Sequence, residues 1–336
     1  MAVICFLWKL TPPHEREDAM KKLLCVFLVL VMLCLVAGCS QKPKTEKPKA
    51  EENYDHVTAW LLAETATADV TGKEVSRTTY SYDQAGVVAE EVLYEDGVET
   101  NRCAYTYDEQ GKVVETANTK DGKAAGRQKN TYDQNGNLKE EVFYQGAMRT
   151  GSCAYTYDEA GNLVAKVTYN GTQEAHRYTY SYDANGNRTE AIYRVSGRES
   201  SRHVYTYDEQ GNVTSETRYS DGDEYCRYTY SYDANGNRTE LLYYGHDEES
   251  YTSTYTYNQA GKLTEELVYV EGIQTSRFIY TYDENGNVTE LIAYMEGKEF
   301  YRYTYSYDKY GNLAAKEHYT NGKLNNTITY KYTPVQ

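Results

Sequence analysis

Proline is nearly absent from this 336-residue sequence: there are five, and none lies between residues 49 and 333. Proline removes a backbone donor and is excluded from central β-strands, so its absence permits a long hydrogen-bonded sheet. Tryptophan (2) and phenylalanine (5) are also scarce, whereas tyrosine occurs 39 times. Disordered low-complexity chains are rich in proline and poor in aromatic residues, so the composition excludes that class.

Basic residues are too few for a nucleic-acid-binding protein. The 35 lysines and arginines are outnumbered by 50 aspartates and glutamates, and the net charge is −15. Binding to a phosphate backbone requires a basic stripe or patch. We therefore expect no nucleic acid among the partners of this chain.

Sequence motifs of common catalytic centres are missing as well. The chain has no G-x-S-x-G, no P-loop, no H-E-x-x-H and no C-x-x-C, which are the patterns of serine hydrolases, nucleotide-binding enzymes, zinc proteases and thiol or zinc sites. We expect a non-enzymatic protein without a cofactor and without a metal site.

Long apolar runs are scarce: the longest comprises the fifteen residues 23–37, which is short for a membrane span. About 20 residues are needed to cross a bilayer. The run follows Lys21-Lys22 and ends in small residues, which is typical of a secretory signal. An uncleaved anchor helix is the alternative interpretation.

The residues after this run, Val36-Ala37-Gly38-Cys39, resemble the lipobox of bacterial lipoproteins. The resemblance implies cleavage after Gly38 and a lipid on Cys39. We therefore expect residues 1–38 to be an upstream extension plus a signal peptide. Residues 39–56 are then the lipidated cysteine and a flexible, lysine- and proline-containing linker. The remaining chain is expected outside the cytoplasm, anchored to a bacterial membrane by lipidated Cys39.

A repeat of 25 residues fills most of the chain. An aspartate that follows tyrosine anchors each unit, with asparagine replacing it once, and a glycine stands three residues after every anchor. The ten anchors are Asp83, Asp108, Asp133, Asp158, Asp183, Asp208, Asp233, Asn258, Asp283 and Asp308.

Each unit has the pattern of a β-hairpin. In R-Y-T-Y-S-Y-D-A-N-G-N-R-T-E, residues 227–240, tyrosine alternates with hydroxyl residues, as in a strand with two different faces. Asp can bond to nearby backbone and Gly accepts the left-handed conformation, so D-x-x-G-N predicts a three-residue loop with a bulge. The turn residues in three units are Asp183, Gly186, Asp233, Gly236, Asp283 and Gly286.

The D-x-x-G-N loop is also superficially similar to a calcium-binding loop. An EF-hand loop has its glycine at the sixth position and a glutamate at the twelfth. Counted from Asp233, glycine is fourth and the twelfth residue is Tyr244. Turn formation is therefore favoured over metal binding.

The repeat predicts the fold class: an all-β array of about ten 25-residue hairpins in residues 83–336. A sheet of about twenty strands does not stay flat, so we expect a coiled antiparallel sheet, either a spiral or an open barrel-like shell. Residues 57–82 precede the first anchor and are expected to form a degenerate N-terminal cap repeat.

The register of the hairpin predicts which residues share a face. If Asp233 pairs with Asn237, then Tyr230 lies opposite Glu240. The tyrosine face would then carry the glutamate seven residues after each anchor, and the opposite face would carry arginines together with Glu141 and Glu266. The candidate ligand-face residues are Tyr178, Tyr180, Tyr182, Glu190, Tyr228, Tyr230, Tyr232, Glu240, Glu265, Tyr280, Tyr282 and Glu290.

The repeated Y-x-Y-D-x-x-G-N, over about residues 70–333, resembles the YD repeats of the RHS family. That resemblance implies a coiled antiparallel β-shell, as in secreted toxins, wall-associated proteins and teneurins, with carbohydrate binding suggested for some. It covers only the repeats and implies no toxin activity.

Two functions remain open at this stage. Aromatic rings mixed with carboxylates resemble sugar-binding surfaces, so the first is a lipid-anchored cell-surface protein that binds extracellular glycan or a surface protein. The second is a passive scaffold whose tyrosine face is sealed, because tyrosine is also simply a strand-forming residue with a polar tip.

Overall fold

The computed structural model of this chain describes residues 59–245 and 250–335. The chain divides into two units, residues 1–55 and 56–336, and the first unit lies outside the described residues. The expected signal peptide in residues 1–38, the lipidated Cys39 and the linker in residues 39–56 also lie outside the described residues.

The described residues form twenty-two β-strands. The even-numbered strands are β2 (Glu74–Tyr82), β4 (Val98–Tyr107), β6 (Lys123–Tyr132), β8 (Met148–Tyr157), β10 (Gln173–Tyr182), β12 (Arg198–Tyr207), β14 (Asp223–Tyr232), β16 (Ser250–Tyr257), β18 (Ile273–Tyr282), β20 (Lys298–Tyr307) and β22 (Lys323–Val335). Those from β2 to β20 each run into the loop that begins at an anchor. The odd-numbered strands are β1 (Ala59–Asp69), β3 (Val88–Glu95), β5 (Val113–Lys120), β7 (Leu138–Gln145), β9 (Leu163–Asn170), β11 (Arg188–Val195), β13 (Val213–Ser220), β15 (Arg238–Gly245), β17 (Leu263–Val270), β19 (Val288–Met295) and β21 (Leu313–Thr320).

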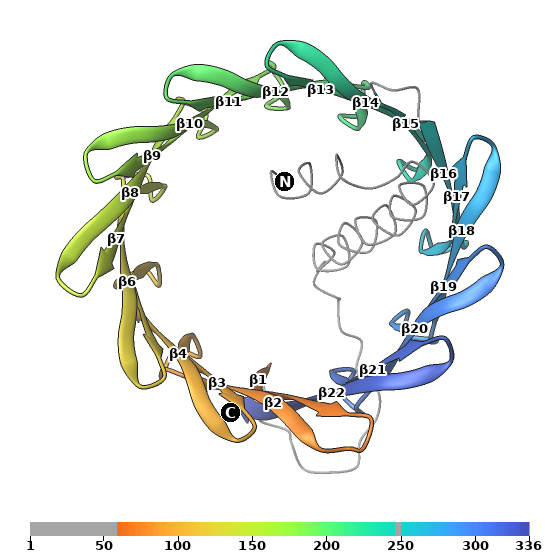
Figure 1. Cartoon of the computed structure of the whole chain (residues 1–336), viewed down its shortest axis with the longest axis horizontal. Coiled ribbons are helices and arrows are strands. Elements are labelled where there is room, and N and C mark those ends of the chain that lie inside the picture. The colour runs from red at the N-terminus through yellow and green to blue at the C-terminus, as the bar shows by residue number, and fades with distance from the viewer. Residues whose placement is uncertain (1–58, 246–249, 336) are drawn as a thin grey trace, which may run out of the picture. The chain divides into compact units, whose positions relative to one another are not determined.

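The sheet closes on itself. Every strand pairs antiparallel with the next one along the chain, and β1 pairs with β22 from Ala59↔Val335 to Asp69↔Asn326. The result is a closed ring (Figure 1). It confirms the predicted coiled antiparallel sheet with a barrel-like shape, but its edges are joined, whereas the predicted forms were a spiral and an open shell. Residues 57–82, expected as a cap, supply β1 and β2 from Ala59 onward.

The anchor residue organises each D-x-x-G loop. At Asp233 the amide N–H donates to the Asn237 carbonyl, and the Asp233 carbonyl accepts from Gly236. The Asp233 carboxylate accepts the amides of Asn235 and Asn237, and the Asn237 side chain as well. Gly236 has φ +81°, a conformation that favours glycine. The carboxylate is thus occupied by its own loop.

The second turn of a unit is tighter, as between β3 and β4. Glu95 pairs with Val98, which leaves Asp96 and Gly97 as the loop, and their φ angles are +47° and +79°. Positive φ at both central residues is the geometry of a type I′ turn, whose twist matches that of the flanking strands.

Two β-bulges per unit separate these turns. In the hairpin of β14 and β15, Tyr232 pairs with Arg238 but Ser231 pairs with Glu240, so Thr239 has no partner. A second shift follows in the pairing of β13 with β14, where Tyr219 pairs with Glu224 and Arg218 with Cys226. Because bulges increase the local twist and bend a strand, their repetition curls the sheet.

The first bulge makes the predicted register wrong by one residue. Glu240 lies opposite Ser231, and Tyr230 lies opposite Leu241. Side chains alternate between faces, so the glutamate seven residues after each anchor leaves the tyrosine face, and the residue eight after the anchor joins it. Glu141 and Glu266 accordingly lie on the tyrosine face, contrary to the prediction.

We call the two surfaces the tyrosine face, which carries residues one, three and five before each anchor, and the arginine face, which carries residues two, four and six before it. The Asp83 N–H bonds to the Val87 carbonyl, on the side of the following strand. Neighbouring residues of a strand direct their backbone N–H and C=O groups to opposite sides. The residues of the tyrosine face, such as Tyr82, therefore direct theirs toward the preceding strand. The chirality of L-residues fixes the rest: when a strand runs upward and its tyrosine face points toward the viewer, these backbone groups point to the right. The preceding strand then lies on the right and the following strand on the left.

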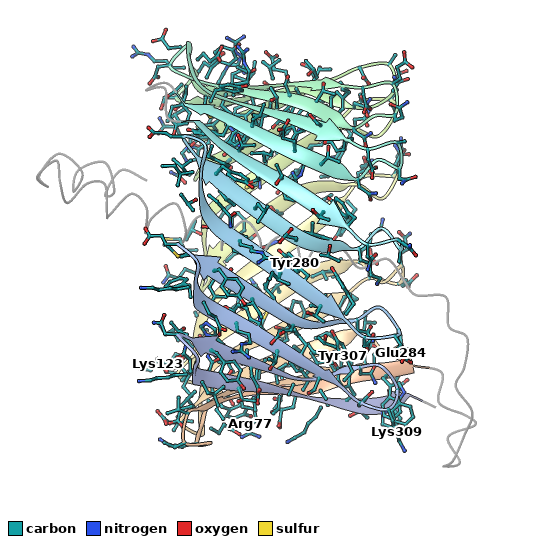
Figure 2. The ribbon with its side chains drawn as sticks, turned by 90° about the vertical axis from the view of Figure 1, so that its right-hand side faces the viewer. Arg77, Lys123, Tyr280, Glu284, Tyr307 and Lys309 are labelled. Carbon is teal, nitrogen blue, oxygen red and sulfur yellow. The ribbon has the colours of Figure 1, made fainter. Side chains whose placement is uncertain are left out.

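A viewer inside the ring sees this arrangement, with the following strand on the left. The strands advance clockwise in Figure 1, and Figure 2 places the D-x-x-G loops of Glu284 and Lys309 at the opposite end from the second turn of Lys123. The even-numbered strands therefore run away from the viewer of Figure 1. The tyrosine face is consequently the inner wall of the ring, and the arginine face is the outer wall.

A ladder of tyrosine hydroxyls joins neighbouring hairpins. The tyrosine directly before each anchor, and Tyr332 at the equivalent position in β22, donates its hydroxyl to a backbone carbonyl of the preceding odd-numbered strand, at 2.6–3.1 Å. The donors are Tyr82, Tyr107, Tyr132, Tyr157, Tyr182, Tyr207, Tyr232, Tyr257, Tyr282, Tyr307 and Tyr332. Each such bond contributes about 1 kcal/mol, so this row of rings holds adjacent hairpins together around the ring.

Within residues 59–245 and 250–335, no helix has the length and apolar character needed to span a membrane.

Candidate functional site: the tyrosine face

The rings three and five residues before the anchors form clusters on the tyrosine face. Tyr178 is 37% exposed and packs against Tyr180, with ring centroids 6.4 Å apart, and against Tyr193 at 4.7 Å. Tyr228 packs against Tyr243 at 5.0 Å. These distances are typical of aromatic pairs, so the rings form a contiguous surface.

Arginines five residues after two of the anchors add cations to this wall. The Arg188 guanidinium lies 5.6 Å from the ring centre of Tyr180 and 5.2 Å from that of Tyr205. Arg238 lies 5.7 Å from Tyr230. These are cation–π distances, so the arginines cover part of the aromatic surface.

The predicted ligand-face tyrosines separate into two sets. Tyr182, Tyr232 and Tyr282 belong to the hydroxyl ladder, so their hydroxyl protons are used by backbone carbonyls. The others stand three or five residues before an anchor. They are Tyr178, Tyr180, Tyr228, Tyr230 and Tyr280.

Burial acts on the second set. Desolvation raises the pKa of Tyr230 to about 12 and raises those of Tyr228 and Tyr280 further. These phenols therefore stay neutral and can act as hydrogen-bond donors at physiological pH.

The predicted glutamates lie on the arginine face. Glu265 accepts from the Arg277 guanidinium at 2.6 Å, and Glu290 lies 3.5 Å from Arg302. Glu190 lies 3.8 Å from Arg202, and Glu240 pairs with Thr254 on the same wall. These carboxylates therefore do not join the tyrosine cluster, because the bulge turns them outward.

Another row of glutamates takes their place. Glu91, Glu141, Glu216 and Glu266, each eight residues after an anchor, lie on the tyrosine face. Tyr105 donates its hydroxyl to Glu91 at 3.3 Å, and Tyr155 donates to Glu141. The combination of tyrosine and carboxylate was thus predicted, but on the wrong glutamates. The missing signal was the unpaired residue six after each anchor, which varies among Ala, Val, Lys and Thr.

Glu216 is the most strongly bound of these carboxylates. His203 lies 2.9 Å and Arg218 2.7 Å from the same oxygen, and the Glu216 side chain is 12% exposed. Burial favours the protonated acid, but the hydrogen bonds and charges of both partners outweigh it and lower the pKa of Glu216 to about 2. The group is ionised at neutral pH and bridges two strands.

Glu266 is in the opposite electrostatic state. It is 2% exposed, and its Oε2 has no hydrogen-bond partner. Desolvation exceeds the help from Ser253, Arg238 and Tyr255 and raises the pKa of Glu266 to about 7. The same wall thus holds one carboxylate that is always charged and one that titrates near neutrality.

The described residues contain no group of three or more His, Cys, Asp and Glu side chains arranged to hold a metal ion. Their three cysteines, Cys103, Cys153 and Cys226, are free thiols.

Comparison with known proteins places the repeat. The family described as RHS Repeat matches residues 132–174 and 157–199, and a MORN repeat variant matches residues 311–332. No curated protein matches the chain.

The solved structures that resemble this chain share little sequence identity with it. The Tc holotoxin pore of Photorhabdus luminescens is 14% identical over 73% of this chain, with a TM-score of 0.41, and this chain spans 15% of that one. Porin-like proteins from Bacteroides uniformis and Bacteroides vulgatus are each 12% identical over 81% and 82% of this chain. The match covers 98% and 100% of their lengths, with TM-scores of 0.32 and 0.25.

The family match falls on units with the same 25-residue period, D-x-x-G loop and tyrosine-rich strand as the rest of the array. Residues 132–199 therefore carry RHS repeats, and the other units of the array repeat the same pattern.

Proposed function

We propose that this protein is a non-enzymatic, lipid-anchored extracytoplasmic shell that binds glycan through its tyrosine face. The observation that carries the proposal is the inner wall itself, where clustered phenol rings alternate with carboxylates. Flat rings stack on the apolar faces of pyranoses, and carboxylates and neutral phenols bond to their hydroxyls.

The ring is wide enough for such a ligand. Twenty-two strands spaced about 4.8 Å apart give a circumference of roughly 105 Å and a backbone diameter of roughly 34 Å. Strand tilt widens a closed sheet further. Side chains from opposite walls do not fill that width, which favours a chain-like ligand entering along the ring axis.

The anchoring part of the proposal rests on the sequence before the ring. The short apolar run, the basic residues before it and the V-A-G-C ending support lipidation of Cys39. The lysine-containing linker supports a surface position with the repeats held away from the membrane.

The test compares two tyrosines of opposite walls. Protein is purified from the membrane fraction in mild detergent, with lipid on Cys39 verified by mass spectrometry, and its retention on immobilised bacterial polysaccharides is measured. Tyr178→Ser is tolerated by the fold, since Ser253 holds the same repeat position, and should weaken retention about tenfold, or about 1.4 kcal/mol.

The matched control is Tyr244→Thr on the arginine face, where another unit has Thr119. It should leave retention unchanged. Absence of retention for the unaltered protein, or equal loss in both variants, refutes glycan binding through the tyrosine face.

A passive shell is the second candidate, and the hydroxyl ladder favours it. Eleven tyrosines bond to neighbouring backbone, so a large share of the tyrosine content has a structural role. A pure scaffold predicts that Tyr178→Ser alters neither binding nor localisation.

A further inference from the structure

The arginine face repeats one cluster around the outer wall. The arginine six residues before an anchor stacks on the tyrosine of the strand paired with it and bonds to nearby glutamates. Arg202 shows the full set: its guanidinium lies 4.6 Å from the ring centre of Tyr219, 3.8 Å from Glu190 and 3.3 Å from Glu199. Arg302 makes the same three contacts with Tyr319, Glu290 and Glu299.

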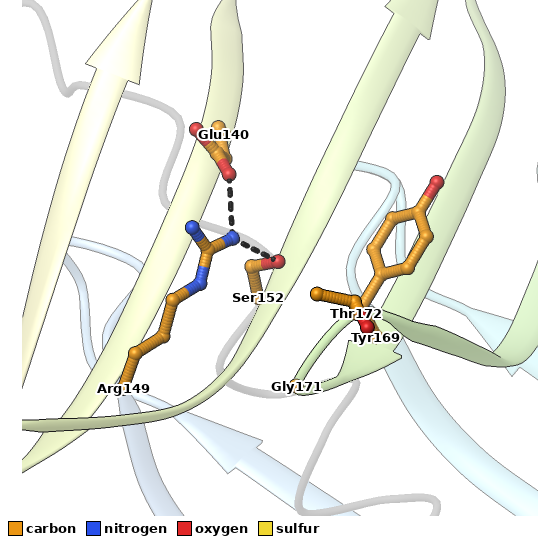
Figure 3. Close-up of a pocket in the computed structure, with 6 residues that line it drawn as sticks. All are labelled: Glu140, Arg149, Ser152, Tyr169, Gly171 and Thr172. Carbon is orange, nitrogen blue, oxygen red and sulfur yellow. Dashed lines mark hydrogen bonds and ion pairs between the residues drawn. The ribbon is translucent and has the colours of Figure 1, made fainter.

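Two units lack this arginine, and in one of them Thr252 holds its position on β16. In the other, Ser152 occupies its position on β8, while Glu140 and Tyr169 keep the positions of the glutamate and the ring. A hollow of about 570 Å³ opens there, lined by Glu140, Arg149, Ser152, Tyr169, Gly171 and Thr172 (Figure 3). Its size falls within the range of small-molecule sites, about 300–1,000 Å³.

Glu140, Arg149 and Ser152 lie on one side of the hollow (Figure 3). Arg149 replaces the glutamate usual three residues before the arginine, and its guanidinium donates to Glu140 at 3.0 Å and to Ser152 at 2.7 Å. Ser152 forms the floor and is 3% exposed. The Tyr169 ring stands on the other side (Figure 3). Arg177 is near enough to interact with it electrostatically, but no cation–π contact to this ring occurs among the described residues.

Charge decides which ligands fit. Glu140 and Arg149 neutralise each other, so an added cation would face Arg149 and an added anion would face Glu140 without compensation. The bare ring offers a flat apolar surface, and Glu140, Arg149, Ser152 and Thr172 offer donors and acceptors around it. A neutral ring-shaped molecule with an apolar face and several hydroxyls satisfies all of these groups.

We propose that the hollow around Ser152 is a second binding site, for a neutral pyranose, in which the sugar ring stacks on Tyr169 and vicinal hydroxyls bond to Glu140 and Arg149. This site goes beyond the proposed function, because it lies on the outer wall, on the face opposite to the proposed glycan-binding tyrosines. The sugar replaces the guanidinium that fills the same space in neighbouring units.

The test restores the missing arginine. Binding of maltose, cellobiose and N,N′-diacetylchitobiose to the full-length protein is measured by calorimetry and saturation-transfer NMR. At least one should bind with millimolar or better affinity, and Ser152→Arg, which fills the hollow with the side chain that other units carry, should weaken it about tenfold or more. Tyr169→Thr, the residue of the unit with Thr119, should do the same.

Val98→Arg is the matched control, because it adds the same charge at a position that is 66% exposed and lies at the turn end of another hairpin. It should change affinity less than about twofold, and all three variants should keep the circular dichroism of the parent. Failure of every disaccharide to bind, or unchanged binding in Ser152→Arg, overturns the proposal. Tyr178→Ser on the inner wall should leave disaccharide binding intact, so this result is separable from polysaccharide retention.

Discussion

Tyrosine has three distinct roles in this protein, and repeat position decides which one a given residue takes. Directly before an anchor, as at Tyr232, the hydroxyl bonds to a neighbouring hairpin. Three or five residues before it, as at Tyr178, the phenol side chain lies on the inner wall of the closed sheet. In the second strand, as at Tyr219, the ring supports an arginine outside. One side chain serves all three roles because it combines a flat apolar body with a single donor.

The carboxylate of Glu216 gives a prediction at this scale. Its pKa is about 2 in the folded chain against 4.5 as the ordinary value. A depressed folded pKa contributes stability above pH 4.5 that is lost as the pH falls from there toward 2. Glu216→Gln should therefore cost on the order of 2–3 kcal/mol of unfolding free energy at pH 7, and progressively less below pH 4.5.

Urea unfolding at a series of pH values measures this difference. Glu209→Gln, at an exposed loop residue, serves as the control and should be neutral throughout. A gap between Glu216→Gln and the parent that stays constant from pH 7 to pH 3 would contradict the assignment.

At the scale of the element, the hairpin is defined by two turns and two bulges. The D-x-x-G loop uses a carboxylate to hold its own backbone, and the type I′ turn uses positive φ at both central residues. Each bulge then bends the strand and rotates later side chains to the other face. A single unpaired residue therefore determines that Glu240 is outside and Glu266 inside.

Replacing two glycines by alanine tests this description, because the expected effects on stability differ. Gly236 has φ +81°, so Gly236→Ala should destabilise by about 1 kcal/mol or more. Gly126 lies within β6 without positive φ, and an added Cβ would meet only the Tyr144 carbonyl at 3.6 Å, an ordinary contact. Gly126→Ala should therefore be neutral or stabilising by up to about 1 kcal/mol. Thermal unfolding compares them, and a loss in both would show that the φ angle is not the cause.

At the scale of the whole ring, closure removes the exposed edges. An open array would present two strands with unpaired backbone groups, which are templates for association with other chains. Here β1 and β22 pair along their length, and Lys331 bonds to Glu64 across the seam at 2.6 Å.

Removal of β1 should therefore cause self-association. Deletion of residues 59–69 leaves β2 and β22 as free edges, and light scattering after size exclusion should show species that grow with concentration. The control is a circular permutant that joins residue 335 to residue 59, which already pair, and opens the chain between Ser196 and Gly197. It should elute like the parent, since exposed turns tolerate new termini. A deletion variant that elutes like the parent would show that the seam is dispensable.

The sequence alone determined the period, the hairpins, the two-faced strands and the turn residues, because each depends on interactions within about ten residues. The placement of the tyrosines on one face followed from strict alternation. The glutamates were assigned to the wrong wall, because the unpaired Thr239 carries no recognisable residue signature.

Only the tertiary structure decided which face is inside, that β1 meets β22, and that the outer arginine cluster is interrupted at Ser152 by an open hollow. The sum of twist and bulge over all the strands fixes curvature and closure, and no single repeat contains that sum.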